Sequence, residues 1–275
     1  MSDEARNAVN ESTDTAARLS PNDAARSSPN DAAGGSPNDA AREAEKHEER
    51  PVLHHLQTVR TGRYYTAGAP AASTRRVWFV LHGYAQLAER FLRHFQGVIP
   101  SDTMVVAPEG LSRFYLELPR ADGGHLSRVG AAWLTREDRE VEIADSRGWL
   151  DSVYREVTDE ITRATGVMPS VTVLAFSQGV ATAMRWIASG VVSPSRVVFW
   201  GGGLAADIDQ NAIRSRMANV ELLFVAGTRD VFATPEARQR IMAECKKLGL
   251  NAREISYDGV HELDRTTVAE LLNLP

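Results

Sequence analysis

Five runs of strand-forming apolar residues, set among segments with helical periodicity, most constrain how this chain folds. The runs cover residues 77–81, 103–110, 170–176, 196–203 and 220–227, and a more polar sixth run covers residues 252–259. Helical spacing of apolar residues occupies residues 138–161, 180–189, 207–217, 238–250 and 264–274. Unbroken apolar strands that alternate with helices are typical of a mostly parallel sheet covered on both faces. We therefore expect an α/β fold with a doubly wound sheet, to which residues 53–68 add two short strands.

The first 50 residues differ from the rest of the chain. They contain no aromatic residue, and their only large aliphatic side chains besides the first methionine are Val9 and Leu19. The motif SPNDAA recurs three times at a period of eight residues, which is too short and too polar for repeats that stack a core. We predict that residues 1–50 form a disordered tail and that residues 51–275 form one domain. An inert extension is the preferred interpretation of the tail, and a partner-binding or surface-tethering role is the alternative.

Composition excludes several classes of protein. Residues 1–50 carry 11 acidic and 6 basic side chains, so their net charge of −5 equals that of the whole chain and the remainder is neutral. No basic face is indicated, and we do not expect nucleic-acid binding. No run is long enough for a membrane span and no signal sequence begins the chain, so a cytoplasmic location is expected. The single cysteine, Cys245, has helical spacing with apolar neighbours and is predicted to lie in the core.

The third run ends on a serine where a turn residue is expected. It continues as AFSQG, and an alanine-rich helix pattern begins within a few residues of Ser177. A sharp strand-to-helix turn exposes the hydroxyl of its corner residue, and the helix that follows offers free N–H groups. Gly179 leaves room for this turn, whereas Ala175 stands where the usual G-x-S-x-G motif has its first glycine. We interpret Ser177 as a candidate nucleophile; the alternative is a serine that only caps the helix.

An acid and a histidine follow Ser177 in the chain order of a catalytic triad. Asp230 comes directly after the fifth run, and His261 directly after the sixth. A serine hydroxyl attacks at neutral pH only when an imidazole takes its proton, and that imidazole needs a carboxylate to hold its tautomer. We expect all three side chains to meet at the edge of the sheet where parallel strands end.

The chemistry also requires two N–H donors for the oxyanion of the tetrahedral intermediate. The amide of Gln178, at the start of the predicted helix, is one candidate. The amide of Tyr84, in the loop that His82 and Gly83 begin after the first run, is the other. A simple strand-terminating turn is the alternative interpretation of that loop.

The motifs LHGYAQ, AFSQG, GTRD and DGVHEL together resemble the α/β-hydrolase superfamily. FSQG, with its short C-terminal spacing, resembles the phospholipase/carboxylesterase group, which includes bacterial carboxylesterases and acyl-protein thioesterases. The resemblance covers residues 77–275 and implies a cofactor-independent serine hydrolase of carboxylic esters or thioesters. Asp207 and Asp209 are rival acids, and Asp230 is preferred because the GTRD loop resembles the family's acid-bearing turn. The donor loop reads His-Gly-Tyr-Ala instead of the group's usual His-Gly-Leu-Gly, a departure that bears on the substrate.

The site is expected to be open, with no large cap domain. Only about 15 residues separate GGGL from the fifth run, where many lipases insert a cap. The segments RFYLE and GAAWLTRED are expected in a loop at the active edge. The candidate substrate-binding residues are His82, Gly83, Tyr84, Phe114, Tyr115, Trp133, Leu134 and Phe232. No metal-ligand spacing and no glycine-rich phosphate loop is present, so we expect no metal and no cofactor.

The sequence therefore predicts an ester hydrolase that acts on a small-molecule ester or thioester. A serine peptidase or acyl transferase on the same fold is one alternative, and a ligand-binding protein without turnover is another. The oligomeric state has no signal in the sequence.

Overall fold

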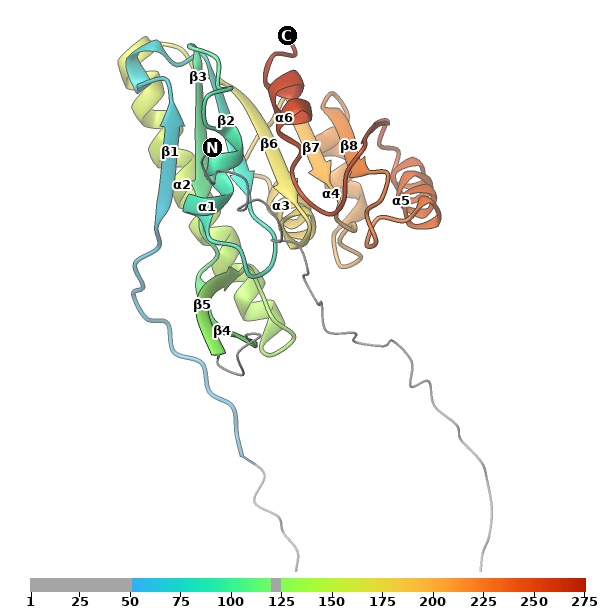
Figure 1. Cartoon of the computed structure of the whole chain (residues 1–275). Helices are drawn as coiled ribbons and strands as arrows, with labels where there is room; N and C mark the ends of the chain where they lie inside the picture. The colour runs from blue at the N-terminus through green and yellow to red at the C-terminus, as the bar shows by residue number, and fades with distance from the viewer. Residues whose placement is uncertain (1–50, 120–124) are drawn as a thin grey trace, which may run out of the picture. The chain divides into compact units, whose positions relative to one another are not determined.

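The computed structural model describes residues 51–119 and 125–275 (Figure 1). The tail predicted for residues 1–50 lies outside the described residues. The chain divides into two units, residues 1–58 and 59–275. In the first unit, residues 51–58 belong to no helix or strand. Every helix and strand named below lies in the second unit.

A seven-stranded sheet forms the centre of the second unit, in the order β1-β3-β2-β6-β7-β8-β9. Its strands are β1 (Tyr64–Gly68), β2 (Arg76–Leu81), β3 (Thr103–Pro108), β6 (Ser170–Phe176), β7 (Arg196–Trp200), β8 (Glu221–Gly227) and β9 (Ala252–Tyr257). β1 pairs antiparallel with β3 and the other pairs are parallel, which confirms the predicted sheet. Of the two short strands predicted in residues 53–68, the structure has one, because only residues 64–68 of that segment pair with β3.

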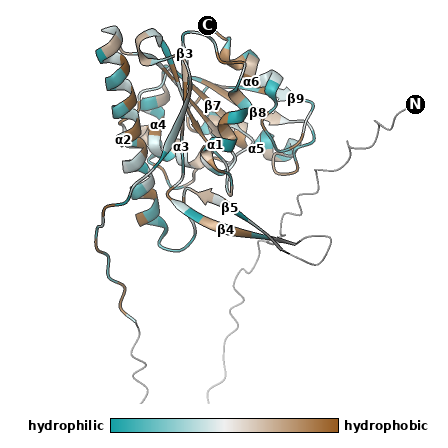
Figure 2. Cartoon of the chain, turned by 60° about the vertical axis from the view of Figure 1, so that its left-hand side comes forward, coloured by the Kyte–Doolittle hydropathy of each residue, from teal (hydrophilic) through white to brown (hydrophobic). Residues whose placement is uncertain are grey.

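Helices cover both faces of this sheet. They are α1 (Ala88–Leu92), α2 (Arg139–Thr165), α3 (Gln178–Ser189), α4 (Gln210–Met217), α5 (Pro235–Lys247) and α6 (Arg265–Leu272), with short 3-10 turns at Ala71–Ser73 (η2) and Arg93–Phe95 (η3). Alternate residues of β2 face opposite ways, so Phe79 packs in one apolar cluster with α2–α5, and Trp78 packs in another with α1 and α6. Figure 2 shows the apolar strands between these helices. Cys245, on α5, is buried in the first cluster, as predicted.

The segment after β3 is a hairpin instead of the predicted loop. β4 (Ser112–Pro119) and β5 (His125–Ala132) pair antiparallel with each other and form a separate two-stranded sheet. Figures 1 and 2 show this hairpin beyond the end of β3, away from the main sheet. Residues 112–117 alternate between half-buried and exposed side chains, the period-two pattern of a strand with one covered face. The hairpin therefore adds a small structure at the edge where the candidate residues lie, and it is not a large cap.

Candidate active site

Ser177 lies at the corner between β6 and α3. Its backbone has φ 53° and ψ −117°, a conformation that residues with a side chain rarely adopt. Two glycines make room for the corner: a methyl group would lie 2.7 Å from the Leu81 carbonyl oxygen at Gly179, and 2.3 Å from the Ser177 carbonyl oxygen at Gly202. Larger residues at either position would push the helix or the strand away. The predicted strained turn is present, and Gly202 is a supporting residue that the sequence analysis did not single out.

The fold brings together the three residues of the predicted triad. His261 Nε2 lies 3.0 Å from Ser177 Oγ, and His261 Nδ1 lies 2.8 Å from Asp230 Oδ2. They follow β6, β8 and β9, three parallel strands that end at the same edge of the sheet. Because Nδ1 faces a carboxylate, it carries the ring hydrogen and Nε2 is free to accept the proton of Ser177. The geometry is that of a nucleophile, a base and an orienting acid.

Asp230 is held as an anion in a buried position. Its side chain is 1% exposed. Oδ1 accepts hydrogen bonds from the amides of Phe232 (2.8 Å) and Ala233 (3.1 Å), and Oδ2 is bonded to His261. Burial by itself raises the pKa of this carboxyl, but the hydrogen bond and charge of His261 and the two amides outweigh it, so the pKa of Asp230 is lowered. The carboxylate can therefore orient the imidazole over the whole neutral range.

Gly201 is a further residue of the site that the sequence analysis did not assign. It follows β7 with φ +60°. A methyl group there would lie 3.1 Å from Asp230 Oδ2 and 3.1 Å from His261 Cε1, so any side chain would press on the acid–base pair. The sequence does indicate a backbone constraint here, because three consecutive glycines end the fourth apolar run.

The side chain of Tyr257 holds the loop that carries His261. The Tyr257 hydroxyl lies 2.7 Å from the Val260 carbonyl oxygen and also contacts that of Glu262, the residues on either side of His261. It accepts a hydrogen bond from Trp200 Nε1 at 3.2 Å. Burial raises the pKa of Tyr257, so its hydroxyl keeps the proton that it donates to the loop.

The two predicted oxyanion donors belong to segments that meet at Ser177. Gln178 is the first residue of α3, so its amide has no carbonyl one turn earlier in the helix to bond. Gly83 lies against the nucleophile, since a methyl group there would be 3.2 Å from Ser177 Cβ, and Tyr84 is the next residue. Within residues 51–119 and 125–275, neither the Tyr84 nor the Gln178 amide donates a hydrogen bond to another protein group. Both amides can therefore bond a ligand, and their role as oxyanion donors stays a prediction.

Two predicted substrate-binding residues are buried and do not line an open site. His82 and Trp133 are 0% and 1% exposed, and their rings stack on each other with centroids 4.8 Å apart. His82 Nε2 accepts a hydrogen bond from the Gly110 amide at 3.0 Å, so Nδ1 carries the hydrogen and donates it to the Gly83 carbonyl oxygen at 2.7 Å. Burial lowers the pKa of His82 to about 4. Trp133 Nε1 donates to the His82 carbonyl oxygen at 2.8 Å. Both rings therefore stabilise the backbone of the loop that His82 and Gly83 begin. The prediction that His82 and Trp133 contact the substrate is wrong, because both side chains are buried.

Other predicted pocket residues are accessible to a ligand. Phe232 is 61% exposed, and its ring centroid lies 4.8 Å from that of His261. Tyr84 is 56% exposed and stacks on Phe114 of the hairpin, with centroids 5.2 Å apart. Tyr115 is also exposed, but it lies on the more solvated face of β4, opposite to the face that carries Phe114. Aromatic side chains are therefore available beside the base and on the donor loop.

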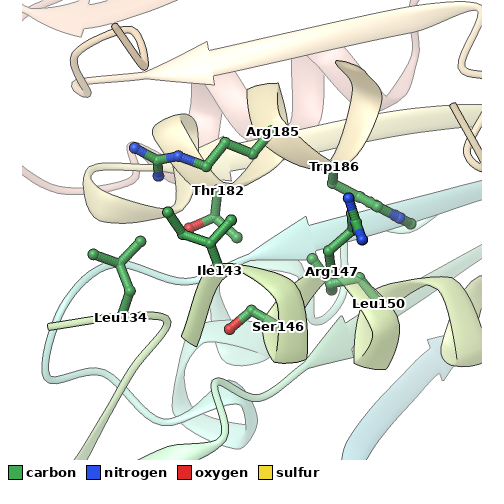
Figure 3. Close-up of a pocket in the computed structure, with 8 residues that line it drawn as sticks. All are labelled: Leu134, Ile143, Ser146, Arg147, Leu150, Thr182, Arg185 and Trp186. Atoms are coloured by element: carbon green, nitrogen blue, oxygen red, sulfur yellow. The ribbon is translucent and has the colours of Figure 1, made fainter. Parts of the chain in front are cut away.

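Leu134 lines a small cavity between α2 and α3 (Figure 3). Arg185 and Trp186 of α3 and Ile143 of α2 are also in its lining, whereas the triad is not. Its volume of about 10 Å³ suits one water molecule. The cavity is thus not a substrate pocket.

The rival acids are engaged elsewhere. Asp207 is bonded to Arg185 Nη2 at 2.8 Å and to Arg139 Nη2 at 2.6 Å, and the bond from Arg185 holds its pKa well below the usual value. Asp209 Oδ1 accepts from two amides at the start of α4 and caps that helix. Asp230 is the acid bonded to His261.

Among residues 51–119 and 125–275, no group of three or more His, Cys, Asp or Glu side chains is placed to hold a metal ion. In the part of the chain that the structure describes, no helix is long and apolar enough to cross a bilayer.

Comparison with known proteins identifies the fold. No protein-family model and no curated protein matches the sequence. The chain is similar to the solved structure of acyl-protein thioesterase 2 from Zea mays, with a TM-score of 0.56 and 18% identity over 77% of this chain and 96% of that one. It is similar to a carboxylesterase from Mesorhizobium loti, with a TM-score of 0.56 and 17% identity over 78% of this chain and 95% of that one. A phospholipase/carboxylesterase from Dyadobacter fermentans gives a TM-score of 0.53 and 13% identity, over 80% and 98% of the two chains. These likenesses confirm the predicted α/β-hydrolase fold.

Proposed function

We propose that this chain is a serine hydrolase of the phospholipase/carboxylesterase group that cleaves carboxylic esters or thioesters through an acyl-enzyme intermediate. The single observation that carries the proposal is the hydrogen-bond chain from Ser177 through His261 to Asp230, with 3.0 Å and 2.8 Å between the bonded atoms. The fold shared with esterases and a thioesterase supports the reaction class. The chemistry uses only groups of the chain and water.

The first half-reaction begins when Ser177 Oγ attacks the carbonyl carbon of the ester and its proton passes to His261 Nε2. The carbonyl oxygen becomes an anion and accepts hydrogen bonds from the Tyr84 and Gln178 amides. The bond to the leaving group then breaks, and the alcohol or thiol takes the proton from Nε2. Asp230 stabilises the imidazolium while it exists and stays ionised throughout.

The second half-reaction repeats these steps with water. His261 Nε2 takes a proton from a water molecule that attacks the acyl carbon, and the same two amides hold the new oxyanion. When the intermediate collapses, Ser177 Oγ leaves and recovers its proton from Nε2, and the carboxylic acid product is released. No electron transfer is involved.

The exposed apolar side chains favour one arrangement of the substrate. His261 protonates the leaving group, so the leaving group departs beside His261 and its neighbour Phe232. Val260, which precedes His261, is also exposed. An ester or thioester with an apolar leaving group therefore suits this side of the site. We propose that the chain hydrolyses such a substrate in the cytoplasm.

The proposal is tested by the hydrolysis of 4-nitrophenyl acyl esters of increasing chain length and of an acyl thioester. We expect turnover by the native chain and loss of turnover in Ser177→Ala, with Ser189→Ala, a change on α3 outside the site, as the control. The same assay with an added amine or alcohol acceptor, and with a peptide anilide, separates hydrolase from transferase and peptidase. Equal rates for the native chain and Ser177→Ala would contradict the proposal.

A further inference from the structure

The two oxyanion donors lie on different parts of the chain. Tyr84 is in the loop after β2, whereas Gln178 begins α3, and the distance between their amides decides how well both can bond one oxygen atom. Residues 130–134, which end β5 and continue past it, contact both parts. We call this segment the brace.

The brace is attached to the donor loop by main-chain hydrogen bonds. The Ala85 amide donates to the Ala131 carbonyl oxygen at 2.9 Å, and the Ala131 amide donates to the Gln86 carbonyl oxygen at 3.2 Å. The contact is close, because a methyl group at Gly130 would lie 2.6 Å from the Ala85 carbonyl oxygen. Trp133 adds the bond from its indole to the His82 carbonyl oxygen. The position of Tyr84, between His82 and Ala85, is therefore set by the brace.

The brace is attached to α3 by the side chain of Gln178. Gln178 Oε1 accepts from the Trp133 amide at 3.1 Å, and Gln178 Nε2 donates to the Leu134 carbonyl oxygen at 3.0 Å. Both ends of the side-chain amide are thus bonded to consecutive residues of the brace. The residue that supplies one oxyanion donor through its backbone is fixed to the loop of the other donor through its side chain.

The brace is in turn bonded to a long helix. Ser146 Oγ of α2 donates to the Trp133 carbonyl oxygen at 2.6 Å. Glu142 of α2 accepts from Ser112 Oγ, at the start of the hairpin, at 2.9 Å, and from Thr135. The brace is therefore held by α2 as well as by the donor loop and α3.

We propose that the side chain of Gln178 is a positioning residue that, through the brace, sets the spacing of the two oxyanion donors. This inference rests on the proposed function and adds the role of the Gln178 side chain to that of its amide. The oxyanion forms only during reaction, so a misplaced donor weakens transition-state binding and leaves substrate binding nearly unchanged. The effect is a fall in kcat at constant KM.

The test is Gln178→Met, which keeps the length of the side chain and removes both hydrogen bonds. The matched control is Gln210→Met, because Gln210 is also the first residue of a helix and is exposed. We expect Gln178→Met to lower kcat by about 10- to 100-fold with KM within twofold of the native value, and the control to leave both unchanged. The dissociation constant of an alkyl boronic acid, which forms a tetrahedral adduct on the serine, should rise by the same factor, while that of the carboxylate product does not.

A second variant, Gly130→Ala, reaches the same spacing from the donor-loop side. It should reproduce the fall in kcat and in boronic acid affinity, and it decides the question if Gln178→Met fails to fold. The inference would be overturned if a folded Gln178→Met kept the native kcat and boronic acid affinity. If Gln178→Met does not fold, the same result in a folded Gly130→Ala would overturn it. Either result would leave the proposed hydrolase intact. A native chain with no hydrolytic activity would overturn both.

Discussion

The hydroxyl of Tyr257 and the backbone of Val260 are joined by a 2.7 Å hydrogen bond that holds the loop of the candidate base in place. Removing that hydroxyl in Tyr257→Phe takes away both bonds to the loop and leaves the buried indole N–H of Trp200 without its acceptor. We expect a loss of about 1–3 kcal/mol in the free energy of unfolding and a fall in kcat, because His261 is held less firmly. Urea denaturation and steady-state kinetics measure the two effects. Tyr115→Phe, which removes an exposed hydroxyl of the hairpin, should leave the free energy of unfolding unchanged, and native kcat in Tyr257→Phe would contradict this role.

The choice between rival acids is decided by Asp230→Asn. An asparagine can donate a hydrogen bond to His261, which favours the wrong tautomer of the imidazole, so kcat should fall by about 10⁴-fold. Asp207→Asn weakens the bonds to Arg185 and Arg139 but leaves the triad intact, and it should retain kcat. Both values come from initial rates at saturating ester. Equal losses in the two variants would show that the acid is misassigned.

Crowding at the acid–base pair predicts the effect of Gly201→Ala. The alanine would adopt φ +60° and place its methyl group 3.1 Å from Asp230 Oδ2, so the pair must shift. A shift of this kind should lower kcat about tenfold or more. Gly203→Ala is the matched control, because a methyl group there meets no atom within 4 Å and φ is not positive. If both variants matched the native chain in kcat, Gly201 would have no part in the site.

Burial of His82 predicts how stability depends on pH. Its pKa is lowered to about 4 in the folded chain, while an unfolded histidine has a pKa of about 6.5. The unfolded state therefore binds the proton more readily, so the stabilising contribution is complete above pH 6.5 and is lost as the pH falls towards 4. We expect the free energy of unfolding to drop by about 3 kcal/mol between pH 7 and pH 4 from this group.

Urea denaturation at several pH values measures this slope in the native chain and in His82→Asn, which can still accept the hydrogen bond from Gly110. The variant should lose that part of the slope. A variant with the native pH dependence would show that folding does not lower the pKa of His82.

The fold and the meeting of the three candidate residues could be predicted, because both follow from local patterns. Apolar runs identify the strands, and residues that directly follow parallel strands meet at one edge, so Ser177, Asp230 and His261 were placed correctly without coordinates. The hairpin was missed because RFYLE was interpreted as loop, although its side chains alternate as in a strand.

The burial of His82 and Trp133 could not be predicted from their positions along the chain. His82 directly follows β2 and Trp133 directly follows β5. The residues next to them in the sequence do not distinguish a buried side chain from an exposed one. Their orientation depends on the path of the hairpin, which turns the indole of Trp133 under the donor loop. Contacts between segments that are distant in sequence, such as those of Gln178 with Trp133 and Leu134, are likewise set by the tertiary structure.

Covalent trapping tests directly whether Ser177 is a nucleophile that His261 activates. Incubation with a fluorophosphonate, followed by peptide mapping with mass spectrometry, should find the phosphonyl adduct on the peptide that contains Ser177. Labelling should be lost in Ser177→Ala and strongly slowed in His261→Ala. A native chain that forms no adduct, or forms it on another residue, would show that Ser177 is not an activated nucleophile.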